Sequence, residues 1–529
     1  MKHKHFLAVA LSCIFGFVSC VNDLDVKVID PNVNTEGNGN AIFNKCYANV
    51  AVAGNGGANG DCDIDGLDGG TTGFVRQMFN ANELTTDEAI CCWGDDGIPA
   101  FNFNQWSASH PMLKGFYYRL YFGVTMCNFY LDNFGDNDAT MSAEVRFLRA
   151  YYYFHLMDCF GNVPFTISST SVESPEQIKR ADLYVWIVNE LKEAEQSMAA
   201  PRTIKYGRAD KAAAWMLLAR LYLNAEVYTG TADWQNAETY AKKVLDSGYK
   251  LNTTGVGKWS AYQMLFMGDN GESSAKDEAI FVALQDGIDI TSWGTTLFLS
   301  ASTFKPDMII DEENNIANGT SETWSGNRCR PDMVAKFFGG DASKAPNGTR
   351  NEMIAAAGDD RALLWGKDRQ LNISNTGEFT HGFSCAKFLN IYSTGAPSHD
   401  TQMMDADFFL MRAAEAYLTY AEARVRQNGP SDGEALAKIN ELRARANADP
   451  LGSISLETLC DEWCREFFFE GRRRSDLIRF GKFGGNNDYK WQWKGGTVNG
   501  ANFSAAFNIF ALPNDEIIAN SNLTQNPGY

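Results

Sequence analysis

The stretch SAEVRFLRAYYYFHLMDCFGNVP, residues 142–164, decides the fold of this chain. Phe147, Tyr151 and Phe154 recur at the i, i+4, i+7 spacing of one helix face, and apolar residues repeat that spacing beside them. A helix that is apolar on most sides must be buried, so its rings are predicted to form a core and not a binding surface. The Gly-Asn pair and the proline at the end of the stretch predict where the helix ends.

Other segments repeat the helical period and predict neighbours for this helix. Within residues 211–245, the pattern W-x2-L-A-x2-Y that begins at Trp215 matches the first helix of a tetratricopeptide repeat. A hairpin of this kind cannot bury its apolar face alone. Its predicted partners are residues 112–133, 143–160, 175–198, 407–427 and 432–448. The chain is therefore predicted to be mainly α, with a tetratricopeptide-like scaffold of helical hairpins in an α/α superhelix.

A loop-rich region separates the two helical parts. Residues 252–404 are rich in Gly, Asn and Ser, with scattered aromatic side chains. Residues 279–284 predict a short strand, one of a few in the fold, and the remainder predicts long loops. Because loops of that length usually carry function in a folded protein, we expect the ligand-binding region here.

Four segments, in order along the chain, resemble the motifs of the SusD/RagB family, the surface glycan-binding lipoproteins of Bacteroidetes. The first is the aromatic helix of residues 142–164. The later ones are DFFLMRAAEAYLTYAEARVR (407–426), REFFFEGRRRSDLIRFG (465–481) and IFALPNDEIIANSNLTQNPGY (509–529). The resemblance spans nearly the whole mature chain. It implies a helical N-terminal region over residues 41–250 and a C-terminal region over residues 251–529 that includes the loop-rich insertion.

The resemblance also implies a function. Family members are not enzymes; they cap a SusC-type TonB-dependent outer-membrane transporter like a lid and capture an oligosaccharide or polysaccharide for import. The chain is thus expected to be a surface-exposed glycan-binding lipoprotein. Its expected partners are a glycan, such a transporter, and the outer membrane through a lipid anchor.

The N-terminus predicts export and lipidation. Residues 6–18 form an apolar run that is too short to span a bilayer but fits a secretory signal peptide over residues 1–19. The sequence FVSC that ends at Cys20 resembles a lipobox, in which the cysteine receives a diacylglycerol. A rival lipobox that ends at Cys13 would leave about five apolar residues, below the usual minimum of about seven. Residues 20–40 predict a solvated tether behind the lipidated Cys20.

Charge argues against nucleic acid as a partner. The net charge is −19 at pH 7, and it becomes −21 when Lys2 and Lys4 leave with the signal peptide. Such a chain repels phosphate backbones. The arginine run at residues 472–474 does not reverse this, because acidic residues flank it and Glu470 stands at i, i+4 to Arg474. Paired charges on a packed helix are the better prediction.

Tryptophans in loops are the best candidates for ligand binding. A sugar ring presents apolar C–H faces ringed by hydroxyls, so its site needs a flat aromatic ring with amides or charged groups nearby. By resemblance, the loop that holds Trp93 contributes a stacking tryptophan in some family members. A tryptophan in a long loop can also pack into the fold and anchor the loop there. The predicted ligand-binding residues are Trp93, Trp293, Trp324, Asp87, Asn327 and Arg328.

Two other functions stay open at this point. A membrane-tethered glycoside hydrolase needs only two carboxylates, although adjacent acids are expected by chance among 65 Asp and Glu. A tetratricopeptide-type interaction scaffold would leave the loop tryptophans incidental. The chain has no G-x-S-x-G and no phosphate-binding P-loop, so serine hydrolase and nucleotide chemistry have no motif to support them.

One short segment resembles the start of a calcium loop. Asp61, Asp63 and Asp65 follow the D-x-D-x-D-G pattern, but Thr72 stands where an EF-hand requires Glu. A looser calcium site and a simple glycine-rich turn are both compatible with this pattern. No other metal or cofactor is predicted, and the ten cysteines that remain besides Cys13 and Cys20 are expected to be mostly buried free thiols.

Overall fold

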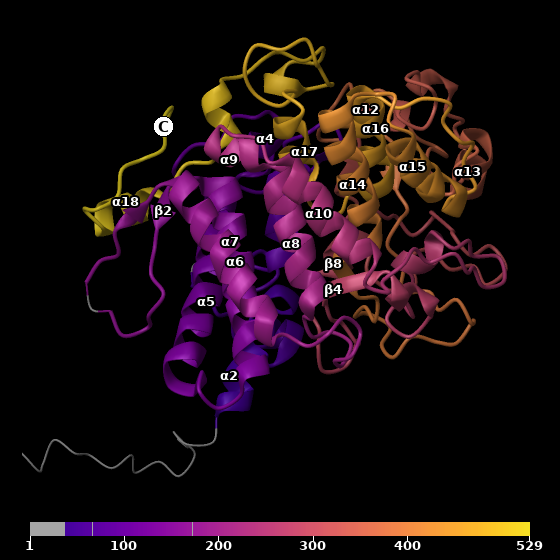
Figure 1. Ribbon diagram of the computed structural model, residues 1–529. Coiled ribbons are helices and arrows are strands. Elements are labelled where there is room, and N and C mark those ends of the chain that lie inside the picture. The colour runs from indigo at the N-terminus through magenta and orange to yellow at the C-terminus, as the bar shows by residue number, and fades with distance from the viewer. Residues whose placement is uncertain (1–37, 66, 172) are drawn as a thin grey trace, which may run out of the picture. The chain divides into compact units, whose positions relative to one another are not determined.

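The computed structural model describes residues 38–65, 67–171 and 173–529 (Figure 1). The chain divides into two units, Met1–Ile42 and Phe43–Tyr529. Residues on both sides of position 250 belong to the second unit. The predicted signal peptide, the lipidation site Cys20 and most of the tether lie outside the described residues.

The aromatic stretch that opens the sequence argument is a buried helix. It is α6, Ala139–Phe160. Asp138 accepts hydrogen bonds from two backbone amides of the first turn, and Gly161 follows the last residue at a φ of 71°. The tyrosines at 151–153 are completely buried. The prediction that these rings form a core is therefore confirmed.

Long helices form a scaffold with α6 (Figure 1). They are α5 Pro111–Phe134, α7 Arg180–Ser197, α8 Lys211–Leu223, α10 Trp234–Leu245, α14 Ala413–Asn428 and α15 Gly433–Arg445. Along the scaffold α5 packs on α6, then α7, α8, α10, α14 and α15 each pack on the helix before. The tetratricopeptide-like hairpin consists of α8 and α10, with a short extra helix, α9 Ala225–Thr229, in its long connection. The predicted mainly α scaffold is confirmed.

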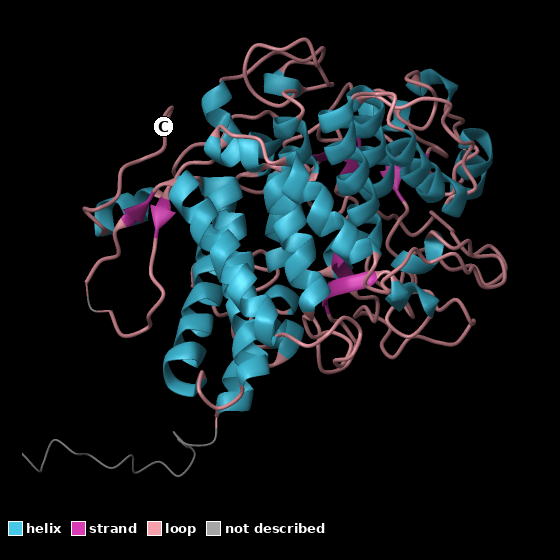
Figure 2. Cartoon of the chain, in the orientation of Figure 1, coloured by secondary structure: helices cyan, strands magenta, loops and turns pink. Residues whose placement is uncertain are grey.

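The strands are short and form antiparallel pairs, two of which join distant parts of the chain (Figure 2). They are β1 Ala89–Cys91 with β5 Asn327–Cys329, β2 Val163–Pro164 with β3 Gln177–Ile178, β4 Ala279–Ala283 with β8 Phe408–Arg412, and β6 Leu364–Trp365 with β7 Ser384–Cys385. The strand predicted over 279–284 is β4. The helix predicted from residue 407 is wrong at its start, because 408–412 form β8. A short apolar run fits a buried strand as well as a helix, and pairing with β4 decides between them.

The remaining α-helices are mostly shorter. Their bounds are α2 Gly39–Ala51, α3 Phe74–Asn82, α4 Ile98–Asn102, α11 Thr296–Ala301, α12 Pro331–Ala335, α13 Arg350–Ala357, α16 Leu456–Phe467, α17 Arg473–Arg479 and α18 Asn514–Ala519. Within the described ranges, no helix is both long enough and apolar enough to span a bilayer.

The three consecutive arginines are paired inside the fold, as predicted. Arg473 is buried, and its Nε lies 2.8 Å from Oδ1 of Asp87, which ties α17 to the segment that leads into β1. One predicted partner is wrong. Glu470 lies in the turn between α16 and α17, not one helical turn before Arg474, and its Oε1 is 2.6 Å from Nζ of Lys387.

Candidate ligand-binding site

The pairing of β1 with β5 brings Trp93 and Trp324 together across the chain. The ladder continues past the strands, because the backbone amide of Cys92 donates to the carbonyl of Gly326 at 3.0 Å. Trp93 follows β1 and Trp324 precedes β5, so their rings lie close together, with centroids 6.5 Å apart and planes tilted by 49°. Nε1 of Trp93 donates to the backbone carbonyl of Trp324 at 3.3 Å.

Trp293 joins this pair from a third segment, just before α11. Its ring centroid lies 6.3 Å from that of Trp324, with the planes at 39°. The end of α11 holds the segment that carries Trp324, because the amide of Trp324 donates to the carbonyl of Ala301 at 2.6 Å. Three tryptophans predicted separately from the sequence therefore lie in one cluster.

The three indoles line an open cavity of about 380 Å³. Each is half-buried, so part of each ring is held by the protein and part is accessible. The full lining is Asp68, Gly70, Arg76, Trp93, Asp95, Trp293 and Trp324. Aromatic surfaces with charged donors and acceptors beside them are the chemistry that a polyhydroxylated ring requires.

Arg76 is a cavity residue that the sequence reasoning missed. It belongs to α3, and its guanidinium carbon lies 4.9 Å from the ring centroid of Phe298 and 5.8 Å from that of Trp93. Its Nε is buried, and no described residue accepts a hydrogen bond from it. Burial lowers the pKa of Arg76, and the charge of Asp68 opposes that shift. Because an arginine stays protonated in proteins, the cavity holds a cation.

Asp68 supplies the opposite charge in the lining. Its carboxylate accepts hydrogen bonds from the amide and the hydroxyl of Thr71, at 2.9 and 2.5 Å. Burial raises the pKa of Asp68, but these bonds and the charge of Arg76 hold it below its ordinary value. The carboxylate is therefore ionised at neutral pH and is an acceptor only.

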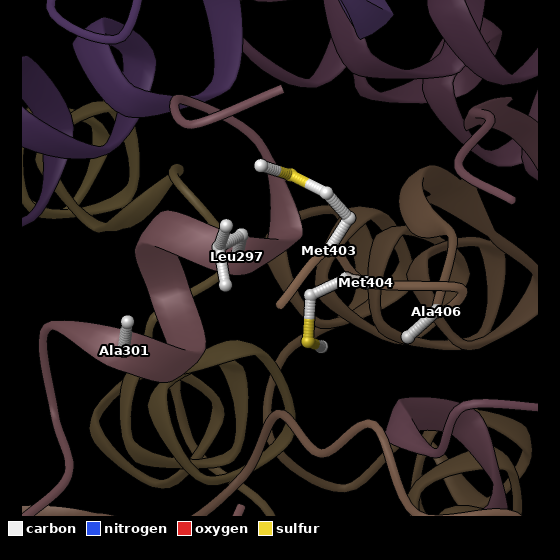
Figure 3. Packing of buried hydrophobic residues seen from close by; sticks show 5 residues of the cluster. All are labelled: Leu297, Ala301, Met403, Met404 and Ala406. Atoms are coloured by element: carbon white, nitrogen blue, oxygen red, sulfur yellow. The ribbon is translucent and has the colours of Figure 1, made fainter. Parts of the chain in front are cut away.

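A buried apolar cluster lies under two of the indoles. Figure 3 shows its members on α11 and on the segment that leads into β8. They are Leu297, Ala301, Met403, Met404 and Ala406. Trp293 and Trp324 pack against this cluster, so the cluster supports both rings from inside the fold.

Glycines allow the close approach of the cavity segments. A Cβ at Gly326 would lie 2.3 Å from Cε2 of Trp93, so the indole rests directly on this backbone. A Cβ at Gly70 would lie 2.9 Å from Cβ of Trp293. Neither glycine has a positive φ. Space for the rings, not backbone strain, explains glycine at both positions.

Three predicted polar ligands do not line the cavity. Asp87 is completely buried and is bound by Arg473; burial raises its pKa, but that guanidinium holds it well below the ordinary value. Asn327 is buried, and its Nδ2 donates to the hydroxyl of Ser302 at 2.9 Å. Arg328 is buried and donates to backbone carbonyls, including that of His381 at 2.9 Å. These side chains are directed into the fold, although two of them follow Trp324 closely in the sequence and the third precedes Trp93 by six residues.

The calcium prediction finds no support in the described residues, which hold no group of three or more acidic, His or Cys side chains placed to bind a metal ion. The carboxylate of Asp63 is already paired, with Nζ of Lys45 at 2.7 Å and Nη1 of Arg119 at 3.1 Å. Every cysteine in the described ranges is a free thiol, and all but Cys62 and Cys92 are buried.

Other hollows differ in their lining. A larger one, of about 680 Å³, lies between the loop around residue 255 and the hairpin of α14 and α15, and Tyr417 is its only aromatic side chain. Another, of about 290 Å³, contains Tyr206, Tyr392 and four acidic residues. One of the acids is Asp407, whose pKa burial raises to about 7. Neither hollow gathers several large rings on one open surface, so the tryptophan cavity is the best candidate site.

A helical scaffold that presents an open aromatic cavity on its loops defines a ligand-binding class of protein, and sequence comparison identifies the family. Residues 341–529 match a family model described as the SusD family, and residues 68–223 match one described as starch-binding associating with outer membrane. The chain is 41% identical to the starch-binding protein SusD of Bacteroides thetaiotaomicron, over 99% of each chain. The chain belongs to the SusD family.

Solved structures share the fold. A SusD superfamily protein from Parabacteroides distasonis superposes with a TM-score of 0.67 and 20% identity, over 94% of this chain and 100% of that one. A laminarin-binding SusD-like protein also gives a TM-score of 0.67 and 20% identity, over 93% of this chain and 99% of that one. At this level of identity the likeness concerns the fold, and it agrees with the mainly α scaffold.

Proposed function

We propose that this protein binds a starch-type oligosaccharide in the tryptophan cavity and does not break it. The observation that carries the proposal is the convergence of Trp93, Trp293 and Trp324 on one open cavity. The relative that is 41% identical over nearly the whole chain is a starch-binding protein, which supports an α-glucan as the ligand.

The geometry suits a curved sugar chain. The indole planes turn by 49° and 39° from one ring to the next, so sugar units stacked on them must turn as well. Arg76 supplies donors to sugar hydroxyls, and Asp68 and Asp95 supply acceptors. Stacking provides most of the affinity, and the charged groups orient the ring.

The protein would act as a capture lid. Lipidation at Cys20 would anchor it to the outer membrane, facing the cell exterior, and a SusC-type TonB-dependent transporter would receive the glycan. The family description that includes outer-membrane association supports this location. Two acids that stand in adjacent acidic pairs are already engaged in ion pairs, Asp87 with Arg473 and Asp359 with Arg361, which makes them poor candidates for hydrolysis.

Calorimetric titration with maltooligosaccharides tests the proposal. Trp93→Ala should weaken binding by about 2 kcal/mol, roughly 30-fold, because it removes a large contact ring. Trp493→Ala is the matched control: that indole is also half-buried and donates to a backbone carbonyl, at 2.8 Å, but lies outside the cavity lining. Release of reducing ends by the purified protein would favour a hydrolase. Binding that survives loss of all three cavity tryptophans would favour an interaction scaffold.

A further inference from the structure

Glu322 connects the tryptophan cavity to a neighbouring loop. Its Oε2 accepts a hydrogen bond from Nε1 of Trp324 at 2.6 Å, and its Oε1 accepts one from Nε2 of Gln402 at 2.8 Å. Hydrogen bonds to a carboxylate are shorter and stronger than those between neutral groups. Neither Glu322 nor Gln402 lines the cavity itself.

The backbone of Trp324 is fixed on both sides. Its amide donates to Ala301 at 2.6 Å, and its carbonyl accepts from Nε1 of Trp93 at 3.3 Å. What is left free is rotation of the side chain about its own bonds. The buried cluster supports one part of the ring, and the bond from Nε1 to Glu322 fixes the polar edge.

The second partner is also held in place. The amide of Ser321 donates to the carbonyl of Thr401 at 2.7 Å, beside Gln402. The carbonyl of Met403 accepts from Nδ2 of Asn390 at 3.1 Å. Gln402 is exposed, but both of its neighbours are bonded to the body of the protein. Glu322 is therefore bonded to a donor whose backbone is fixed independently of the indole.

We propose that Glu322 and Gln402 determine the glycan specificity of the cavity by fixing the tilt of Trp324 against Trp93 and Trp293. They are positioning residues, and the inference rests on the proposed function. With the tilt fixed, the three rings match a sugar chain whose successive units turn. If Trp324 rotated freely, the cavity would lose that preference and would bind straight and curved sugar chains with more similar affinities.

Glu322→Ala and Glu322→Gln test this inference against two probes, a cyclodextrin and a linear cello-oligosaccharide. Glu322→Ala should lower affinity for cyclodextrin about 10-fold, which corresponds to about 1.4 kcal/mol, and reduce the preference for it over the linear chain. Glu322→Gln should keep wild-type binding, because its amide can still accept from Trp324 and donate to the side-chain oxygen of Gln402. Glu313→Ala, at an exposed glutamate paired with Lys258, is the charge-matched control.

Near-ultraviolet circular dichroism supplies a second readout, because it reports fixed aromatic rings. The tryptophan bands should weaken in Glu322→Ala and stay unchanged in Glu322→Gln and Glu313→Ala. If Glu322→Ala does not fold, Gln402→Ala replaces it. The affinity for cyclodextrin should then fall about threefold, because the hydrogen bond between Trp324 and Glu322 remains. If Glu322→Ala, or Gln402→Ala in its place, binds cyclodextrin with unchanged selectivity and unchanged tryptophan bands, this inference is overturned and the proposed function is not. A wild-type protein that binds no α-glucan would overturn the proposed function and the inference together.

Discussion

Substitution of Gly326 by alanine should displace Trp93 without removing it. The added Cβ would lie 2.3 Å from Cε2 of the indole, whereas carbon atoms pack at about 3.5 Å or more, so the ring must move by about 1.2 Å. This shift would break the long hydrogen bond from Nε1 to Trp324, worth about 1 kcal/mol, and would add an over-packing cost of about 1–3 kcal/mol. We expect a stability loss of about 2–4 kcal/mol and a glycan affinity that falls at least about 10-fold.

Urea unfolding and calorimetric titration with a maltooligosaccharide measure the two effects of Gly326→Ala separately. Gly94→Ala is the control, because it adds the same methyl group directly after Trp93 with nothing within 4 Å of the new atom. The control should match the wild type in both assays. An affinity for glycan that is unchanged in Gly326→Ala, despite the stability loss, would refute the contact between Trp93 and the ligand.

Three further predictions concern the core, a buried acid pair and the cavity cation. Tyr152→Ala should cost about 3–5 kcal/mol in urea unfolding, because the ring is completely buried, and should leave the glycan affinity of the folded protein unchanged. Burial and the adjacent charge of Glu88 raise the pKa of Glu83 in the folded protein above its value in the unfolded chain. The stability that the proton on Glu83 supplies is therefore complete below the pKa of Glu83 in the unfolded chain, and it is lost as the pH rises through the pKa of Glu83 in the folded protein. Glu83→Gln, which stays neutral, should therefore gain stability relative to wild type over that range by up to about 1.4 kcal/mol per pH unit; a constant difference across pH would contradict this. Arg76→Met should weaken glycan binding by about 1.5–3 kcal/mol in calorimetry without lowering the melting temperature, and a large drop in that temperature would instead indicate a structural role.

The helical scaffold could be predicted because its information is local. The apolar period of α6 and its flanking breakers lie within one stretch, and the predicted helices at 112–133 and 432–448 agree with α5 and α15 to within three residues at each end. The start of α14 could not be predicted, because β8 exists only through its pairing with β4, more than a hundred residues earlier.

The candidate site could be predicted only in part. A tryptophan in a loop is visible in the sequence, so Trp93, Trp293 and Trp324 could be selected as candidates, and the structure brings them to one cavity. The polar residues that line this cavity could not be selected, because the direction of a side chain depends on distant contacts: Asp87 binds Arg473, 386 residues away. Arg76 gave no useful signal, since a single cation on a short helix is usually a solvated residue.

A crystal structure of the protein with a bound maltooligosaccharide tests the central claim most directly. The account predicts sugar rings stacked on Trp93, Trp293 and Trp324, with hydroxyl groups within hydrogen-bonding distance of Arg76 and an unbroken glycosidic chain. An oligosaccharide bound elsewhere on the protein while this cavity stays empty, or a cleaved product in the cavity, would contradict it.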